Sequence, residues 1–147
     1  RAHEAELKTY KLMINMDVGG SVMGHNFVRA TCEESVAHYL QILASEIGYH
    51  ADIKQGLMGS DSTPFADLKI PAVGFGRGAA HGLEFAHSRH DTIDYISPDR
   101  LAEVAGFVRL FAERVTDSKV FPISQVIPDN VVERIDKMLR GKEDKKK

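Results

Sequence analysis

Short apolar runs alternate with amphipathic helical segments along this chain, and this alternation restricts its fold more than any other feature. Residues 12–16 and 70–75 are apolar runs of the length of buried strands, and glycine-containing loops follow both of them. Between them, residues 52–57 are expected to form a more polar second strand, which makes residues 70–75 the third, whereas residues 21–30 are expected to be irregular or to form a short strand. Strands separated by helices predict an α/β layered fold with a largely parallel sheet.

The first long helix is predicted to begin just after residue 31. Thr31 and Glu34 match the S/T-x-x-E capping box, in which each side chain bonds a backbone N–H of the first turn. Gly48 is the expected end, because glycine readily takes the left-handed conformation that follows a helix. The apolar face of this helix, at the 3.6-residue period, consists of Val36, Tyr39, Leu40, Leu43 and Ile47.

Three further helices are expected toward the end of the chain. A short one lies within residues 61–68. Ser97 followed by Pro98 is typical of an N-cap and a first helical residue, and it predicts a helix of about five turns. Residues 131–139 form a short amphipathic segment before a basic, solvated end.

Composition excludes several classes of protein. The 147 residues carry 19 Lys+Arg against 21 Asp+Glu, a net charge of −2, so the charge balance gives no support to nucleic-acid binding. The single Cys32 excludes an intrachain disulfide framework and a cysteine-rich zinc site. Every apolar run is far shorter than the ~20 residues that span a bilayer, so no membrane span is predicted. The length suits one domain, yet three strands make a thin sheet, and we expect it to be part of a larger one.

Candidate ligands gather where the strands end. In open α/β sheets the ligands bind at the carboxyl ends of strands, and carboxylates and imidazoles in such loops suit a divalent cation. Three places fit: the residue after the first strand, the turn at 59–64 and the loop after the third strand, which we expect over residues 76–91. Their donors are Asp17, Asp61, His81, His87, His90 and Asp91.

Each donor also has an ordinary structural role that residue types leave open. Asp17 can accept N–H groups of the following turn, and Asp61 is as well suited to cap the short helix as to bind a metal. Asp91 can brace a turn. The spacing of His87 and His90 is a ligand pair on a helix, but it carries little weight in a loop.

Three ordered motifs resemble the co-catalytic zinc aminopeptidases. They are Ile14-Asn15-Met16-Asp17, then Gly59-Ser60-Asp61-x-x-Pro64-Phe65 with Ile70-Pro71-Ala72, and then His87-Ser88-x-x-Asp91-Thr92. That family includes bacterial leucyl aminopeptidases, glutamate carboxypeptidase and glutaminyl cyclase, with the transferrin receptor as a metal-free relative. The resemblance runs from about residue 11 to 115. It implies a three-layer α/β/α sandwich with a mostly parallel mixed sheet that holds two zinc ions, incomplete in this chain.

The resemblance implies two metal ligands here, Asp17 and His87, which serve different ions in the family. The bridging Asp and the catalytic Glu have no counterpart, so we expect them upstream and expect no catalytic residue in this chain. The pair Glu33-Glu34 follows Asp17 instead of preceding it and does not match the family order.

Other residues are implied as neighbours of the metal site. Ser60 and Asp61 would line the substrate cleft. Proximity in the same loop suggests Arg77, His81 and His90 for oxyanion or carboxylate contacts. Asp91 would orient the His87 imidazole or brace the turn. Substrate preference is not predicted, since Ala86 and Ser62 stand where many relatives have Tyr and His.

The resulting expectation is part of a zinc aminopeptidase that hydrolyses amide bonds with a zinc-activated water. Residues 1–120 would be the C-terminal part of the catalytic domain and residues 121–147 an extension. The isolated chain is predicted to be inactive. Its partners would be a peptide or amino-acyl substrate, the missing N-terminal half and, through open strand edges, a second copy. The alternatives are a non-catalytic relative or structural fragment, and a module that binds anions through residues 76–91; exopeptidase or cyclase chemistry and compartment stay open.

Overall fold

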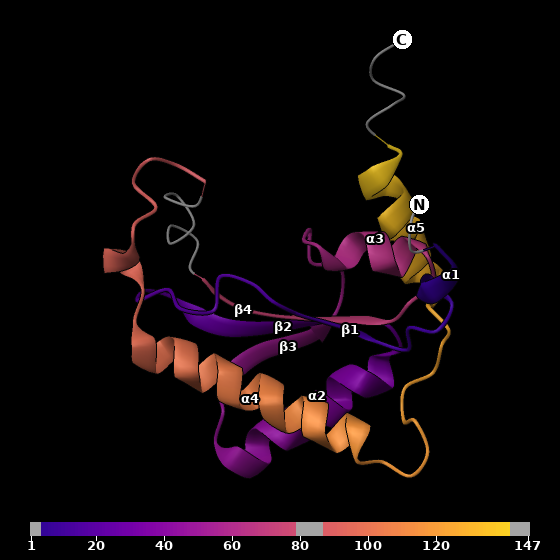
Figure 1. The fold of residues 1–147 in the computed structure, drawn as a ribbon, viewed down its shortest axis with the longest axis horizontal. Coiled ribbons are helices and arrows are strands. Elements are labelled where there is room, and N and C mark those ends of the chain that lie inside the picture. Colours follow the sequence, from indigo (N-terminus) through magenta and orange to yellow (C-terminus); the bar gives the residue numbers. More distant parts are fainter. Residues whose placement is uncertain (1–3, 79–86, 142–147) are drawn as a thin grey trace.

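The computed structural model describes residues 4–78 and 87–141 and forms one mixed sheet with helices on both faces (Figure 1). The sheet order is β1-β4-β2-β3, with β1 parallel to β4, β2 parallel to β3, and β2 antiparallel to β4. The strands are β1 (Met13–Met16), β2 (His25–Thr31), β3 (Ala51–Gln55) and β4 (Ala72–Gly78). The expected three-layer α/β/α arrangement is confirmed.

Two long helices cover one face of the sheet, and two shorter helices cover the other (Figure 1). The first pair is α2 (Glu34–Ile47) and α4 (Pro98–Thr116); the second is α3 (Ser62–Asp67) and α5 (Asp129–Leu139). In the described part of the chain, the remaining helices are α1 (Glu4–Leu7) and the 3₁₀ helix η1 (Ile93–Tyr95). Among the described residues, no helix combines the length and the apolar character needed to cross a bilayer.

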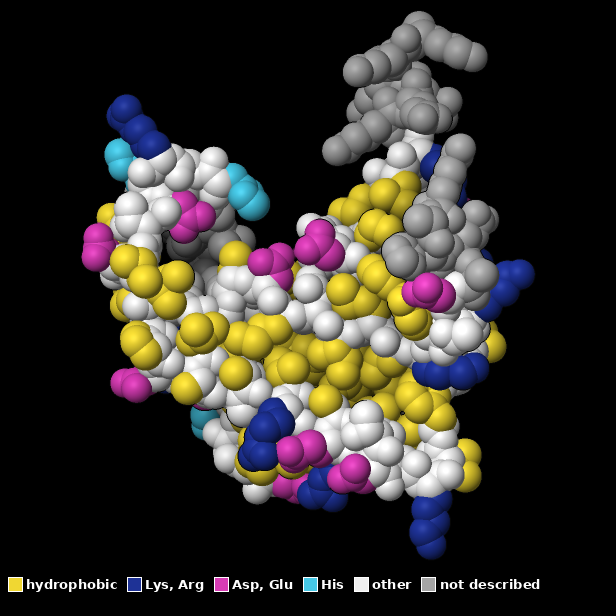
Figure 2. Space-filling view, in the orientation of Figure 1, with side chains coloured by type: hydrophobic (Ala, Val, Ile, Leu, Met, Phe, Trp, Pro, Cys, Tyr) yellow, Lys and Arg dark blue, Asp and Glu magenta, His cyan; other side chains and the backbone are white. Residues whose placement is uncertain are grey.

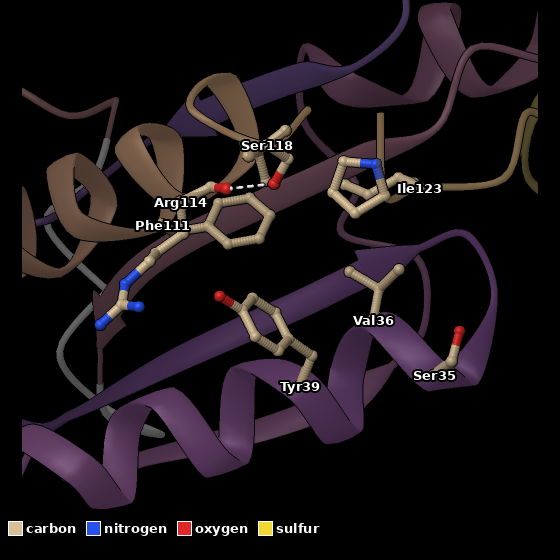
Figure 3. A pocket seen from close by; sticks show the side chains of 9 residues that line it. Ser35, Val36, Tyr39, Phe111, Arg114, Ser118 and Ile123 are labelled. Carbon is tan, nitrogen blue, oxygen red and sulfur yellow. Dashed lines mark hydrogen bonds between the residues drawn. The ribbon is translucent and has the colours of Figure 1, made fainter. Parts of the chain in front are cut away.

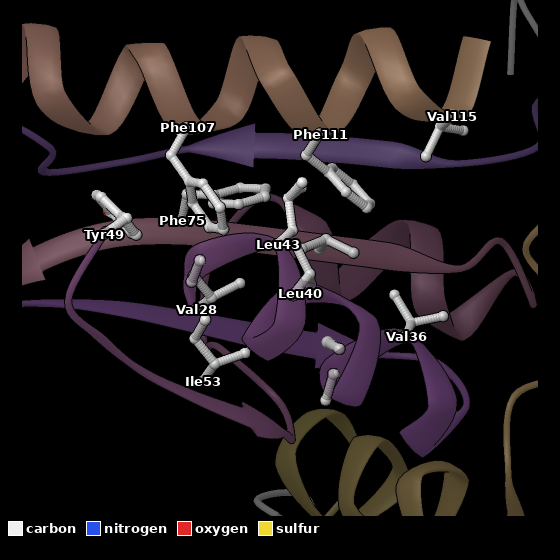
Figure 4. Close-up of a cluster of buried hydrophobic side chains, with 14 of the residues drawn as sticks. Val28, Val36, Leu40, Leu43, Tyr49, Ile53, Phe75, Phe107, Phe111 and Val115 are labelled. Carbon is white, nitrogen blue, oxygen red and sulfur yellow. The ribbon is translucent and has the colours of Figure 1, made fainter. Parts of the chain in front are cut away.

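The main core lies between the sheet and the two long helices (Figure 4). Phe75 of β4 meets two rings of α4, with centroid distances of 5.9 Å to Phe107 and 5.7 Å to Phe111. Leu40 and Leu43 of α2 complete this layer. Each such side chain contributes roughly 1.5–3 kcal/mol through burial, so this layer supplies much of the stability.

Of the two alternatives for residues 21–30, the structure supports the strand, which runs over residues 25–31 and lies in the interior of the sheet. In β2 the side chains at Asn26, Val28 and Ala30 are buried in alternation. Its polar residues obscured the strand in the sequence: Asn26 and Arg29 are satisfied by partners far along the chain. The two other strand boundaries also differ, since β3 ends at residue 55 and β4 continues to residue 78.

The capping box is wrong, although the helix that it predicted exists. Thr31 is the last residue of β2, and its hydroxyl donates a 2.8 Å hydrogen bond to the Gly56 carbonyl. The helix face is also rotated, because Tyr39 and Ile47 are 40% and 51% exposed while alanines are buried. The N-cap of α4 is confirmed: the Ser97 hydroxyl accepts from the Arg100 N–H at 3.3 Å.

Helix α5 is attached to α3 on the second face of the sheet. Val131 and Ile135 are buried against Ala66 in a smaller apolar cluster. The Arg140 guanidinium donates to the Asp67 carboxylate at 2.9 and 3.1 Å. Helix α5 and Arg140 therefore pack on α3, and the domain boundary at residue 120 stays a prediction.

We expect Gly76→Ala to destabilise the fold. A Cβ at this position of β4 would lie 2.6 Å from Phe27 Cζ and 2.8 Å from the Asp17 carbonyl oxygen, and backbone cannot give way cheaply. The free energy of unfolding should fall by ~1–3 kcal/mol, as for an overpacked site. Urea denaturation measures this. Gly106→Ala is the control: its Cβ meets nothing within 4 Å in the middle of α4, and it should gain ~1 kcal/mol.

Asp52 on the edge strand β3 should make stability depend on pH. Its carboxylate lies 2.8 Å from Lys54 Nζ and 2.7 Å from Arg29 Nη2, and the hydrogen bond from Lys54, followed by that from Arg29, lowers its pKa. A carboxylate whose pKa is lower in the folded than in the unfolded state stabilises the protein at pH values above the unfolded-state pKa of about 3.9. This stabilisation is lost as the pH falls below that value toward the folded-state pKa.

Asp52→Asn should therefore remove part of the stability at pH 7 and flatten the loss between pH 5 and 3, to be followed by urea midpoints. Asp117→Asn serves as the control, because this exposed carboxylate has no ion pair in the described part of the chain. Parallel pH curves for wild type and Asp52→Asn would contradict this prediction.

Candidate functional site

The first predicted site residue, Asp17, leaves the sheet beside β4. Strands β1 and β4 are hydrogen-bonded parallel neighbours, with Met16 opposite Phe75, so their carboxyl ends lie at one edge. Asp17 follows β1 directly, and its N–H donates to the Phe75 carbonyl at 2.9 Å. Its carboxylate is exposed and has no hydrogen-bond or ion-pair partner within residues 4–78 and 87–141. Asp17 is thus held by its backbone while its side chain is available.

His87 opens the segment that returns from β4 to α4, here called the arm (residues 87–97). Its φ of 63° is in the left-handed region. Its backbone N–H donates to the Asp91 carboxylate at 3.3 Å, and the Asp91 N–H donates to the Ser88 carbonyl at 3.1 Å. Asp91 thereby braces the turn; the described contacts include none between its carboxylate and the His87 imidazole. His90, also exposed, lies in the same turn, where its backbone N–H donates to the Ser88 hydroxyl.

The turn before α3 crosses the sheet near the end of β1. The Met58 side chain occupies the space over Gly74, which stands opposite Asn15 in the sheet register. The hydroxyls of Ser60 and Ser62 are 2.9 Å apart. Asp61 occupies the N-cap position of α3, but its side chain accepts no capping hydrogen bond and is exposed. The capping alternative for Asp61 is therefore wrong, and its carboxylate is open to solvent.

A hollow is visible on this side of the molecule (Figure 2). It lies between the arm and the α3–α5 pair, with acidic side chains on its floor and a histidine side chain on its wall. Gly74 and Gly76 have no side chain on this face of β4, so neighbouring segments approach the strand closely. The position at the carboxyl ends of parallel strands is where α/β folds bind ligands.

Arg77 does not lie in the loop in which the sequence analysis had placed it. It belongs to β4, and the two-residue period puts its side chain on the Phe75 face, toward α4. It is 8% exposed, and its guanidinium donates to the Ser21 carbonyl at 2.8 Å and to Asn26 Oδ1 at 3.0 Å. His81 and Ala86 lie outside the described residues.

Asn15 is a site neighbour to which the sequence analysis assigned no role. Its Nδ2 atom is buried and has no hydrogen-bond partner in the described part of the chain. An unpaired buried amide costs roughly 1–3 kcal/mol, so a partner is expected. The sequence signal that could have identified Asn15 is an amide side chain within an otherwise apolar strand.

The donor types fit zinc, but their number does not complete a site. Zinc takes carboxylate oxygen and imidazole nitrogen, which Asp17 and His87 offer. Among residues 4–78 and 87–141, however, no three His, Cys, Asp or Glu side chains form a group that could hold a metal ion. The described residues thus supply individual ligands.

A separate cavity of about 310 Å³ lies on the other face of the sheet (Figure 3). Val36 and Tyr39 of α2, Phe111 of α4 and Ile123 line it, with Arg114 at its rim. Its lining contains no carboxylate and no histidine, so it does not have the chemistry of the hollow.

Comparisons with known proteins point to one family. The family model of peptidase family M28 matches residues 1–112. Two solved structures of BSAP, a zinc aminopeptidase from Bacillus subtilis, are similar: one has 24% identity and a TM-score of 0.62, and covers 85% of this chain. The other has 23% identity and a TM-score of 0.58, and covers 84%. This chain spans 33% of either structure, and the likeness at this identity is one of fold. No curated protein matched.

Val18, next to Asp17, should be strained. Its φ of 47° is unfavourable for a β-branched residue, and such strain costs roughly 1–3 kcal/mol. Val18→Gly should raise the free energy of unfolding by ~0.5–1 kcal/mol, because the relieved strain exceeds the entropy cost of glycine. Thermal unfolding measures this. The nearby exposed Val22, whose φ is not positive, is the control, and Val22→Gly should lower stability. Equal losses for both variants would show that Val18 is unstrained.

Proposed function

This chain belongs to peptidase family M28, and on that premise we propose that it forms the part of a zinc-dependent aminopeptidase that carries two metal ligands, Asp17 and His87. The family is one of co-catalytic zinc peptidases. The observation that best supports the proposal is the parallel pairing of β1 with β4, which brings Asp17 to the side of the sheet where β4 ends, while the far end of the arm is hydrogen-bonded to the loop after Asp17 through the Val22 and Ser97 N–H groups. The side chains of Asp17 and His87 are both exposed.

In the proposed site, Asp17 holds one zinc ion through a carboxylate oxygen and His87 holds the other through an imidazole nitrogen. Zinc, when bound, lowers the pKa of a bound water and polarises a carbonyl. Asp17 is suited to its role because its backbone is fixed to β4 while its carboxylate has no partner in the described residues. The Asp91 contact to the His87 N–H fixes the backbone from which the imidazole projects.

Ser60 and Asp61 are proposed to line the cleft in which a peptide or amino-acyl substrate lies. The turn that carries them crosses β4 at Gly74, beside β1. The Asp61 carboxylate is not used as a helix cap and is exposed, so it is available to a substrate. A cationic substrate group, such as a free α-amino group, is the chemical match for a carboxylate at this position.

The bridging carboxylate and the general base are proposed to come from other residues of the same catalytic domain. Strand β1 pairs only with β4 among the described strands, which leaves its other edge open. The unpaired Asn15 Nδ2 lies on this strand. We propose that a further strand of the domain adds to β1, since an open edge and an unpaired amide both favour a partner.

The test measures zinc content and aminopeptidase turnover of residues 1–147 and of a longer protein that includes the proposed remainder of the domain. The longer protein should bind two zinc ions and hydrolyse aminoacyl-p-nitroanilides, and residues 1–147 alone should be inactive. In the longer protein, Asp17→Ala and His87→Ala should each reduce bound zinc by one ion. Turnover should fall by more than the ~10–100-fold that loss of an outer partner of a ligand causes.

Matched controls are Asp117→Ala and His38→Ala, which remove exposed side chains of the same types, from the C-cap of α4 and from α2. Zinc content and turnover should be unchanged in both. A longer protein without zinc would favour a non-catalytic relative, and robust turnover by residues 1–147 alone would contradict the proposed division of ligands.

A further inference from the structure

A chain of polar contacts lies beneath the carboxyl end of β4, on the α4 side of the sheet. Arg77 Nη1 donates to Asn26 Oδ1 at 3.0 Å, and Asn26 Nδ2 donates to Glu103 Oε1 at 3.1 Å. Asn26 Nδ2 also donates to the His50 carbonyl at 3.2 Å. Asn26 is 3% and Arg77 8% exposed, so the inner part of this network is buried. Buried networks of satisfied polar groups hold a fixed geometry.

The outer end of the network reaches the loop that follows Asp17. Arg77 Nε donates to the Ser21 carbonyl at 2.8 Å. The same loop is bound to the arm, because the Val22 N–H donates to the Tyr95 carbonyl at 3.0 Å and the Ser97 N–H donates to the Gly20 carbonyl at 2.8 Å. Arg77 therefore contacts the loop at the point where it joins the arm.

This loop requires external support. Val18 adopts a φ of 47°, and strained backbone of this kind persists only where the surroundings hold it. Within the described residues, Arg77 is the charged side chain that binds a carbonyl of residues 18–22 from the interior. Arginine suits the task better than lysine, since Nε and Nη1 donate in two fixed directions, one to the loop and one to Asn26.

We infer that Arg77 is a positioning residue: its guanidinium, oriented by Asn26, holds the loop at residues 18–22 and thereby sets the direction of the Asp17 carboxylate. The part of this inference that concerns metal rests on the proposed function. Arg77 acts from the opposite side of the sheet and contacts neither metal nor substrate. The residue that the sequence suggested for a cleft contact thus has a different task, one layer below.

The experiment uses the longer protein and compares Arg77→Met and Arg77→Lys with wild type. Zinc affinity is measured by competition with a chelator, and hydrogen exchange follows the Val22 and Ser97 amides. Arg77→Met should weaken zinc binding ~10–100-fold, the range for residues that orient a ligand. Both amides should exchange at least tenfold faster. Arg77→Lys should recover only part of both losses, because an ammonium group cannot reproduce the two directed bonds.

Two controls separate positioning from general stability. Arg109→Met removes an arginine of α4 that is 74% exposed and paired with Glu113, and it should change neither readout. Val131→Ala destabilises the separate cluster around α5, and at a comparable loss of thermal stability it should leave zinc affinity and both amides unchanged. Arg77→Met that matches Val131→Ala in both readouts would overturn the inference. If the wild type binds no zinc, the proposed function fails, and the two exchange rates alone decide whether Arg77 holds the loop.

Discussion

The hydrogen-bonded pairing of β1 with β4 is the interaction on which the rest of the site depends. It joins two segments that are about sixty residues apart, with Met16 opposite Phe75, and thereby places Asp17 beside the last part of β4. The close approach is possible because Gly76 has no side chain to meet the Asp17 carbonyl. Site geometry and fold stability are therefore not separable here, since the contact that orders the edge also orients Asp17.

The two faces of the sheet have different tasks. The face toward α2 and α4 carries the aromatic core and gives the sheet its rigidity (Figure 4). The other face carries glycines on β4, the turn before α3 and the hollow (Figure 2). The Arg77 network connects these tasks, because it begins in the core layer and ends at the Ser21 carbonyl of the loop after Asp17. A site on loops thus obtains its order from a buried layer beneath it.

The predictable parts of the fold are the strands and helix ends that depend on their own residues and not on contacts with distant parts of the chain. Strands β1 and β4 each contain a single polar side chain among apolar residues and glycines, and Ser97 with Pro98 begins α4 through purely local contacts. The interior strand β2 was predictable only as one of two alternatives, because Asn26 and Arg29 become acceptable only beside Glu103 and Asp52, which the folded chain brings near. For the site, the motif order predicts Asp17 and His87 as ligands, which stays a prediction, whereas the face on which Arg77 lies depended on where β4 ends.

The reversed direction of β2 has a consequence for how this region can change during evolution. The connection at residues 56–61 must pass from the end of β3 across β2 to reach β4 at Gly74. Two strand spacings are about 9.5 Å, and the three residues from Gln55 to Met58, whose side chain lies over Gly74, reach only ~10 Å when extended, so this crossing has little spare length. Homologous chains of this topology should therefore vary the turn by substitution and keep its length, even where substrate preference differs.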